Sequence, residues 1–312
     1  MKTKLLATLA IFGMVASASA VKVNNNLSIN GFIDGSYKMV DADNAANDDQ
    51  GLDLDEVELN FNYTNGSVSG LVSIDSAGGT NDLDLEQAHI TYQLNDSVSF
   101  TFGKYGSALG LEGEDPAGLY TYSRAYEDDA FNSGNIDAAA NVVTGLTVAY
   151  SADSFSLAAS LEEAAGQNLE AEDLNLELSF TYTGFNGINI GGGYFFDNAQ
   201  VAANEVDELN LNISRQLGKL LLAGEYTQLK QDAGDRDAYL ILADYDVNDK
   251  IGVAVRLSNA EVAGGAADFE KFTIAPNYAI TDSLGAILEW SDVEGGANGD
   301  AEEYAVELTY TF

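Results

Sequence analysis

Apolar and polar residues alternate with a period of two along nearly all of the chain after residue 20. The C-terminal segment is the clearest case, where one face holds Tyr304, Val306, Leu308, Tyr310 and Phe312. Glu, Ala and Thr occupy the opposite face of this segment, and the same alternation runs over 174–182, 209–214 and 251–258. Successive side chains of a β-strand point to opposite faces, so this period predicts strands with one apolar and one polar face.

The connections between the predicted strands are alternately short and long. The short ones contain the Asn, Asp, Gly and Ser residues that tight hairpin turns require, and they lie at 64–67, 95–97, 152–154, 184–187, 217–219, 247–250 and 281–283. The long ones are acidic and rich in Gly, Ala and Asn, and they lie at about 41–51, 75–82, 105–140, 163–172, 197–206, 230–237, 261–268 and 293–302. Seven short turns and eight long loops join sixteen strands.

Two architectures produce this alternation. A soluble sandwich buries the apolar face of each strand in its core, whereas a membrane barrel turns that face toward lipid. Alternating short and long connections between strands of about ten residues are typical of bacterial outer-membrane barrels, and the chain ends on an aromatic strand at Phe312. We therefore predict an all-β fold: a 16-stranded antiparallel transmembrane β-barrel with short periplasmic turns, long extracellular loops and a long third loop. A secreted sandwich or solenoid is the alternative.

The N-terminus predicts export. Lys2 and Lys4 precede an apolar run over 5–15, and the small residues Ala18-Ser19-Ala20 follow it, which is the pattern of a cleaved signal peptide. The apolar run is too short for a transmembrane helix, which needs about 20 residues. We expect residues 1–20 to be removed and residues 21–312 to form a single barrel domain in the bacterial outer membrane.

The composition excludes several function classes. The chain has 50 Asp and Glu against 13 Lys and Arg, a formal net charge of −37, and therefore lacks the basic surface that nucleic acids require. It has no cysteine and a single histidine, His89, which leaves few residues for nucleophilic or metal-dependent catalysis. No Gly-x-Ser-x-Gly, His-Glu-x-x-His or phosphate-binding loop is present. We predict no enzymatic activity, no cofactor and no dedicated metal site, although acidic loops could bind Ca²⁺ or Mg²⁺ loosely.

A polar inner face predicts a channel. Barrels of sixteen strands enclose an aqueous lumen that side chains do not fill. The longest connection, 105–140, joins the fifth and sixth strands and mixes acidic residues with Leu109, Leu111, Leu119 and several tyrosines. Long loops are usually functional, and the apolar side chains of this one indicate that it packs against something. We expect it to pack against the inner barrel wall and constrict the lumen. An external cap on the barrel mouth or a contact with another subunit is the alternative.

Together, the signal peptide, sixteen strands, terminal Phe312 and long third loop resemble the trimeric general diffusion porins of Gram-negative outer membranes. Phe102-Gly-Lys-Tyr-Gly106 looks like their Gly-(Arg/Lys)-x-(x)-Gly signature before the constriction loop, and 102–126 is also similar to the OmpL-like β-barrel porins. The resemblance implies a homotrimer in contact with outer-membrane lipid and lipopolysaccharide, which passes ions and small hydrophilic solutes by diffusion.

In that family the third loop places acidic residues opposite basic residues of the wall. On this resemblance the acidic candidates are Glu112, Glu114 and Asp115, and the basic candidates are Lys38, Lys104, Arg124, Arg256 and Lys271. The basic residues are few and dispersed, which departs from the family pattern. Because acidic residues predominate in lumen and loops, we predict a mild cation preference.

Two alternatives remain open at this point. Aromatic residues line sugar channels, and Tyr120, Tyr122 and Tyr126 could form such a track in a substrate-specific channel. A non-conducting barrel that acts as an adhesin, receptor or envelope anchor would need the same wall.

Overall fold

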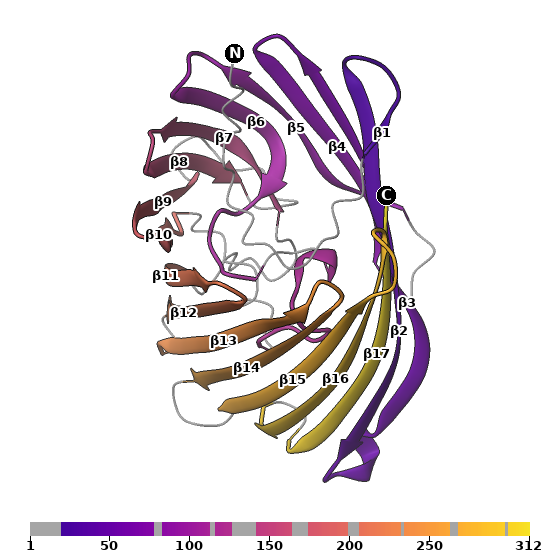
Figure 1. Cartoon of the computed structure of the whole chain (residues 1–312). Coiled ribbons are helices and arrows are strands. Elements are labelled where there is room, and N and C mark those ends of the chain that lie inside the picture. The colour runs from indigo at the N-terminus through magenta and orange to yellow at the C-terminus, as the bar shows by residue number, and fades with distance from the viewer. Residues whose placement is uncertain are drawn as a thin grey trace.

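The computed structural model describes residues 20–77, 83–112, 116–126, 142–163, 174–198, 206–231, 234–262, 268–296 and 299–312. These residues form a closed antiparallel barrel of sixteen strands with one short additional strand (Figure 1). The predicted fold is therefore confirmed. No helix among the described residues is long and apolar enough to cross a membrane. The predicted signal peptide falls almost wholly outside the described residues.

The first half of the barrel begins with the additional strand β1 (Val21–Lys22), which pairs with the start of β2 and which the sequence pattern did not predict. The following strands are β2 (Leu27–Ala42), β3 (Asp49–Asn65), β4 (Val68–Ala77), β5 (Asp84–Gln93), β6 (Val98–Gly106), β7 (Val142–Ser151), β8 (Phe155–Glu163) and β9 (Asn175–Phe185). Two short 3₁₀ turns lie in loops, η1 (Ala45–Asn47) and η2 (Pro116–Gly118).

The second half continues in the same way, each strand pairing with the next. Its strands are β10 (Ile188–Phe196), β11 (Val206–Leu217), β12 (Leu220–Gln231), β13 (Arg236–Asn248), β14 (Ile251–Val262), β15 (Phe269–Ala279), β16 (Leu284–Gly295) and β17 (Ala301–Thr311). The barrel closes where β17 pairs with β2. The terminal residue completes this closure, because the backbone N–H of Phe312 donates to Gly31 O at 3.0 Å and Gly31 N–H donates to Phe312 O at 3.1 Å.

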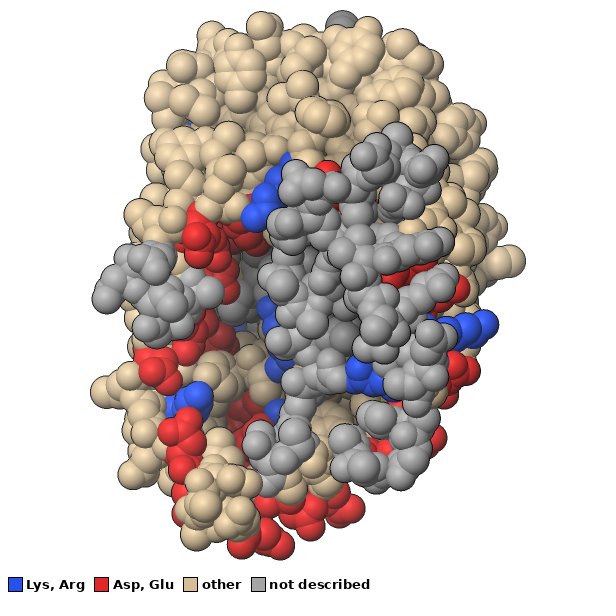
Figure 2. Space-filling model, turned by 180° about the vertical axis from the view of Figure 1, so that it is seen from behind, with Lys and Arg blue, Asp and Glu red and all other residues tan. Residues whose placement is uncertain are grey.

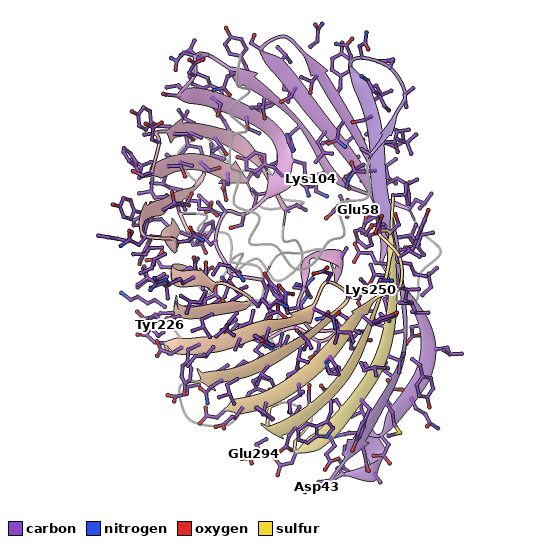
Figure 3. All side chains as sticks on the ribbon, viewed as in Figure 1. Asp43, Glu58, Lys104, Tyr226, Lys250 and Glu294 are labelled. Atoms are coloured by element: carbon purple, nitrogen blue, oxygen red, sulfur yellow. The ribbon has the colours of Figure 1, made fainter. Side chains whose placement is uncertain are left out.

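The two faces of the wall follow the alternation in the sequence. On β17, Val306, Leu308 and Tyr310 are exposed on the outer surface, while Glu307 is buried on the inner one. Figure 3 shows Glu58 on the inner side of the wall, and Asp43 and Glu294 at the end that carries the long loops. Apolar side chains around the whole outer circumference suit contact with lipid, and the polar inner face is sealed from it.

Two β-bulges change which side chains face inward. Asp34 and Gly35 of β2 pair with Glu56 and Leu54, so that Asp55 is left as an extra residue of β3. Ser73 and Ile74 of β4 likewise pair with Gln87 and Leu85, which leaves Glu86 as an extra residue of β5. A bulge resets the alternation by one residue. Glu86 is consequently buried on the inner face, where its carboxylate accepts a hydrogen bond from Ser73 Oγ at 2.7 Å.

Candidate functional site in the barrel lumen

The long connection after β6 enters the lumen and contacts the inner wall (Figure 1). At its start, Ser107 Oγ donates a hydrogen bond of 2.5 Å to the carboxylate of Glu177, and the backbone N–H of Ala108 donates to the same group at 3.1 Å. Glu177 lies on the inner face of β9. Leu109 follows and is buried. We call residues 107–126, as far as they are described, the lumen segment.

Arg256 is the main contact between the lumen segment and the wall. It lies on β14, where Val255 and Leu257 point outward and the guanidinium points inward, fully buried at 0% exposure. Its Nη1 donates to Glu112 Oε1 at 2.6 Å, to Thr121 Oγ1 at 2.7 Å and to Ser123 O at 2.9 Å. Its Nη2 donates to Arg124 O at 2.7 Å and to Ser123 Oγ at 3.2 Å. One side chain therefore contacts both described stretches of the lumen segment, 107–112 and 116–126.

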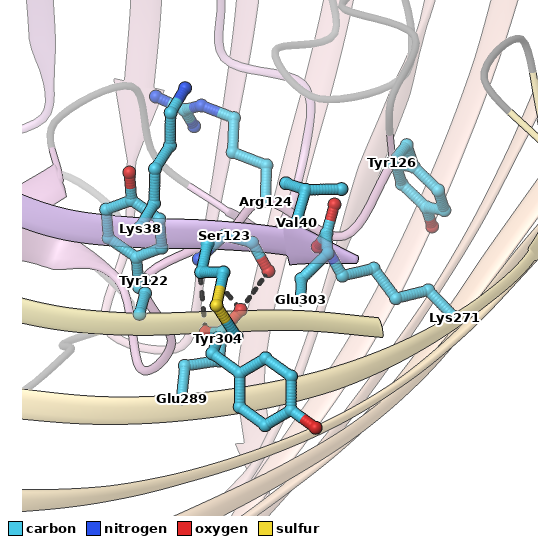
Figure 4. A pocket seen from close by; sticks show the side chains of 12 residues that line it. Lys38, Val40, Tyr122, Ser123, Arg124, Tyr126, Lys271, Glu289, Glu303 and Tyr304 are labelled. Carbon is cyan, nitrogen blue, oxygen red and sulfur yellow. Dashed lines mark hydrogen bonds and ion pairs between the residues drawn. The ribbon is translucent and has the colours of Figure 1, made fainter. Parts of the chain in front are cut away.

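A carboxylate on β16 makes a second contact with the lumen segment. Glu289 accepts hydrogen bonds from the backbone N–H of Ser123 at 3.1 Å and from Ser123 Oγ at 2.5 Å (Figure 4). Ser291 Oγ, two residues along the same inner face, donates to Glu289 at 3.0 Å and fixes its orientation. Within the loop, Ala125 N–H donates to Glu112 Oε2 at 2.8 Å. Glu112 is thus shared between the wall and the loop backbone.

Apolar packing accompanies these polar contacts. Leu111, Ala125 and Tyr126 are buried in one hydrophobic cluster with inner-wall residues of β11 to β16, Leu229, Leu240 and Leu242 among them. Tyr120 packs against the same cluster. An inner wall that is partly apolar would be unfavourable in contact with water. The lumen segment covers it, and this removes the apolar side chains of both partners from solvent.

The three tyrosines of the lumen segment are held in neutral form. Burial, together with nearby carboxylates, raises the pKa of Tyr120 and of Tyr126 well above the usual value. Burial also raises the pKa of Tyr122 to about 12, with the carboxylates of Asp55, Glu307 and Asp34 contributing. Tyr122 OH accepts a hydrogen bond from Ser36 Oγ of β2 at 3.0 Å. These rings therefore act as packing and hydrogen-bonding groups.

Most of the site residues predicted from the sequence make polar contacts in the structure. Glu112 is in direct contact with Arg256, and Glu114 and Asp115 lie outside the described residues. Lys38 Nζ lies 3.3 Å from Asp49 Oδ2 and Lys271 Nζ lies 2.5 Å from Glu303 Oε2. Lys104 Nζ donates to Leu85 O at 2.8 Å. Three of the basic candidates, Lys38, Arg256 and Lys271, are therefore in contact with carboxylates.

Lys38, Arg124 and Lys271 line a common cavity of about 270 Å³ between the lumen segment and strands β2, β15, β16 and β17. Figure 4 shows this cavity with Glu289, Glu303 and Tyr122 also on its walls. Side chains of both charge signs therefore border one cavity beside the lumen segment. Figure 2, from the opposite side, shows acidic side chains along the opening, with basic ones between them.

Glu177 and Glu289 are wall carboxylates that contact the lumen segment and were absent from the predicted site. Both are single carboxylates on the polar face of a predicted strand, and the sequence offers many of these. Their partners, Ser107 and Ser123, are short hydroxyl residues in a loop and carry no distinguishing pattern. Among the described residues, no group of three or more His, Asp or Glu is placed to hold a metal ion.

A closed barrel with an apolar exterior, a polar lumen and a long segment docked inside it defines a membrane channel protein. The family model for Gram-negative porins matches residues 6–312, and the chain belongs to this family. It is therefore an outer-membrane porin, a channel for the diffusion of small solutes, and family and fold indicate a channel rather than an enzyme. No curated protein matches it in sequence.

Solved structures agree in fold. Outer-membrane expressed OmpT of Vibrio cholerae has a TM-score of 0.67 at 17% identity, covering 94% of this chain and 100% of its own. The trimer form of in-vitro folded OmpT has a TM-score of 0.64 at 16% identity, with 92% and 99% covered. OmpF of Salmonella typhi, in complex with daunomycin, has a TM-score of 0.64 at 14% identity, with 94% and 100% covered.

Proposed function

We propose that this porin is mildly cation-selective and that the connection 105–140 narrows its lumen. The observation that carries the selectivity is the pairing of its basic residues. Lys38, Arg256 and Lys271 each contact a carboxylate, so that each pair has little net charge as seen by an ion in the lumen. Further carboxylates, including Asp55 and Glu58, line the same inner wall, and the whole chain carries 50 acidic residues against 13 basic ones. The resulting field attracts cations.

The effect is expected to be small and salt-dependent. The Debye length is about 8 Å at physiological ionic strength, so that charges on the wall act over only part of a wide lumen. Rings of acidic residues favour cations in channels, but here the acidic side chains are distributed along the wall. We therefore expect a permeability ratio for K⁺ over Cl⁻ of only a few-fold, decreasing as salt is raised.

Reversal potentials in a planar bilayer test this proposal. The purified, refolded protein is inserted and the zero-current potential is measured across a KCl gradient. We expect discrete ohmic steps and a potential of the sign that K⁺ preference gives. The variant Asp55→Asn should reduce the preference, and Leu257→Met, on the outer face, is the matched control and should not change it. A potential of the opposite sign would refute the cation preference.

The same recordings separate the alternatives. A heat-modifiable barrel that inserts and yields no current steps would mean that the docked loop closes the lumen, as expected for an adhesin, receptor or envelope anchor. The positions of the tyrosines do not favour a sugar channel, because Tyr120 and Tyr126 pack against the wall and Tyr122 contacts Ser36. Block of the current by an added sugar would instead support a sugar-specific channel.

Two further proposals concern the assembly of the protein and its export. The OmpT trimer form supports a homotrimer, embedded in outer-membrane lipid and lipopolysaccharide. Residues 1–20 are proposed to be the cleaved signal peptide. Chemical crosslinking and N-terminal sequencing of the membrane-extracted protein test these two points directly.

A further inference from the structure

The outer wall carries an apolar groove of about 280 Å³ near the short-turn end of β11 and β12. Ile188, Ile213 and Leu222 line it together with Gly224, and Arg215 borders it. The groove lies outside the lumen, since Ile213 and Leu222 are on the exposed, lipid-facing surface. None of the contacts that hold the lumen segment involves these residues.

A missing side chain forms the groove. Leu222 and Tyr226 of β12 point outward, so Gly224 between them presents its backbone to the lipid. The residues paired with Gly224 on either side are Ile213 of β11 and Ile241 of β13. Their side chains are 50% and 61% exposed. The exposed side chains of Ile213 and Ile241 thus flank a gap at Gly224, where no side chain covers the backbone of β12.

Arg215 supplies a charge at one end of the groove. It pairs with Ile188 on one side and Leu222 on the other, and its side chain is on the exposed outer face. Among the described residues it has no hydrogen bond or ion pair. Its outward neighbours in the same row, Ile188, Leu222 and Ala243, are apolar. The positive charge therefore has no carboxylate beside it on this surface.

The depth of Arg215 matches the membrane interface. Ile188 pairs with Phe185, whose exposed ring lies at the end of β9 near the short turn. Exposed aromatic residues form girdles at the two interfaces of outer-membrane barrels. A basic side chain at this level is close to lipid phosphates, which it contacts favourably. Gly224 lies farther from the turn, at the level of the acyl chains.

We propose that an anionic phospholipid of the periplasmic leaflet binds here, with its phosphate on Arg215 and one acyl chain in the groove over Gly224. The apolar lining matches an acyl chain, and the unopposed guanidinium matches a phosphate. The site is independent of the channel activity.

Native mass spectrometry of the delipidated protein, titrated with dioleoyl phosphatidylglycerol, tests the proposal. We expect the unaltered protein to retain one lipid per chain. Arg215→Gln and Gly224→Leu should each weaken that binding at least tenfold, the first by removing the charge and the second by filling the groove. A side chain at Gly224 is tolerated by the fold, because its Cβ would lie 3.5 Å from Leu240 O, an ordinary contact.

Two control variants distinguish a specific site from general adhesion. Lys230→Gln removes a basic residue from the outer face of the same hairpin at its loop end, and Ala286→Leu enlarges an outward residue of β16. Both should bind as the unaltered protein does. Equal binding by all variants, or equal loss in Arg215→Gln and Lys230→Gln, would overturn the proposal. A change of oligomeric state in Gly224→Leu with unchanged lipid binding would also overturn it, because a second copy would then cover the groove.

Discussion

Replacement of Arg256 by methionine should release the lumen segment from the wall while the barrel stays folded. The guanidinium is buried and donates five hydrogen bonds to Glu112, Thr121, Ser123 and Arg124. Its loss leaves the carboxylate of Glu112 without its cation. Every neighbouring strand pair of the barrel retains its ladder, so the damage is confined to the docking of the loop.

The magnitude follows from the buried ion pair. Breaking such a pair by removing one partner costs about 3–5 kcal/mol. Each 1.4 kcal/mol is about tenfold in an equilibrium constant, so the ratio of docked to undocked loop should fall by about two to nearly four orders of magnitude. The packing of Leu111, Ala125 and Tyr126 and the contacts of Glu177 and Glu289 oppose complete release.

Thiol labelling measures this change, since the chain has no cysteine of its own. Leu111→Cys places a single thiol in the buried cluster, and its rate of modification by a maleimide reports undocking. We expect this rate to rise by about a hundredfold or more when Arg256→Met is added, within the range that the buried pair predicts. Single-channel recordings of the same protein should show larger current fluctuations.

Two further variants make the test specific. Lys271→Met removes another buried basic residue whose ion-pair partner, Glu303, is on the wall, and it should leave the labelling rate unchanged. Glu112→Gln added to Arg256→Met should recover part of the docking, because no buried charge then lacks a partner. Labelling and conductance that are unaltered in Arg256→Met would refute this account of how the loop is held.

Three other predictions concern the wall and the loop tyrosines. Gly192→Ala should prevent formation of the heat-modifiable barrel, because Gly192 has φ +146° and a Cβ there would lie 2.2 Å from Asn210 O, whereas Gly224→Ala should fold normally. Leu257 points outward in β14, and Leu257→Arg should lower the free energy of unfolding by about 2–4 kcal/mol, as measured by urea unfolding of the protein in lipid vesicles. Gln87→Arg, on the inner face, should change this free energy much less. Tyr122 has its pKa raised to about 12, so its contribution to docking is complete below pH 10 and is lost as the pH rises through 12. A difference titration at 295 nm between the unaltered protein and Tyr122→Phe should show a step near pH 12, and a step near pH 10 would contradict the burial of this ring.

The strands and turns could be predicted from the sequence because their signals are local. The short turns predicted at 95–97, 152–154 and 281–283 are the connections that the structure has between β5 and β6, β7 and β8, and β15 and β16. A strand that faces lipid on one side must alternate along its whole length, so each segment carries its own evidence. The bulges are the exception. One extra residue at Asp55 or Glu86 turns a carboxylate inward, and nothing in the alternation marks it.

The lumen contacts were not predictable in the same way. Glu112 and Arg256 were both candidates, but as opposing charges across an opening, whereas they are in contact at 2.6 Å. Their separation of 144 residues means that only the closed barrel brings them together. Glu177 and Glu289 depend equally on where the loop comes to lie. Alternation, turn chemistry and charge therefore determined the barrel and its acidic character, because they act between neighbours in the chain. The tertiary structure alone decided which carboxylates hold the loop and which basic residues they neutralise, since these contacts exist only after the sheet has closed around it.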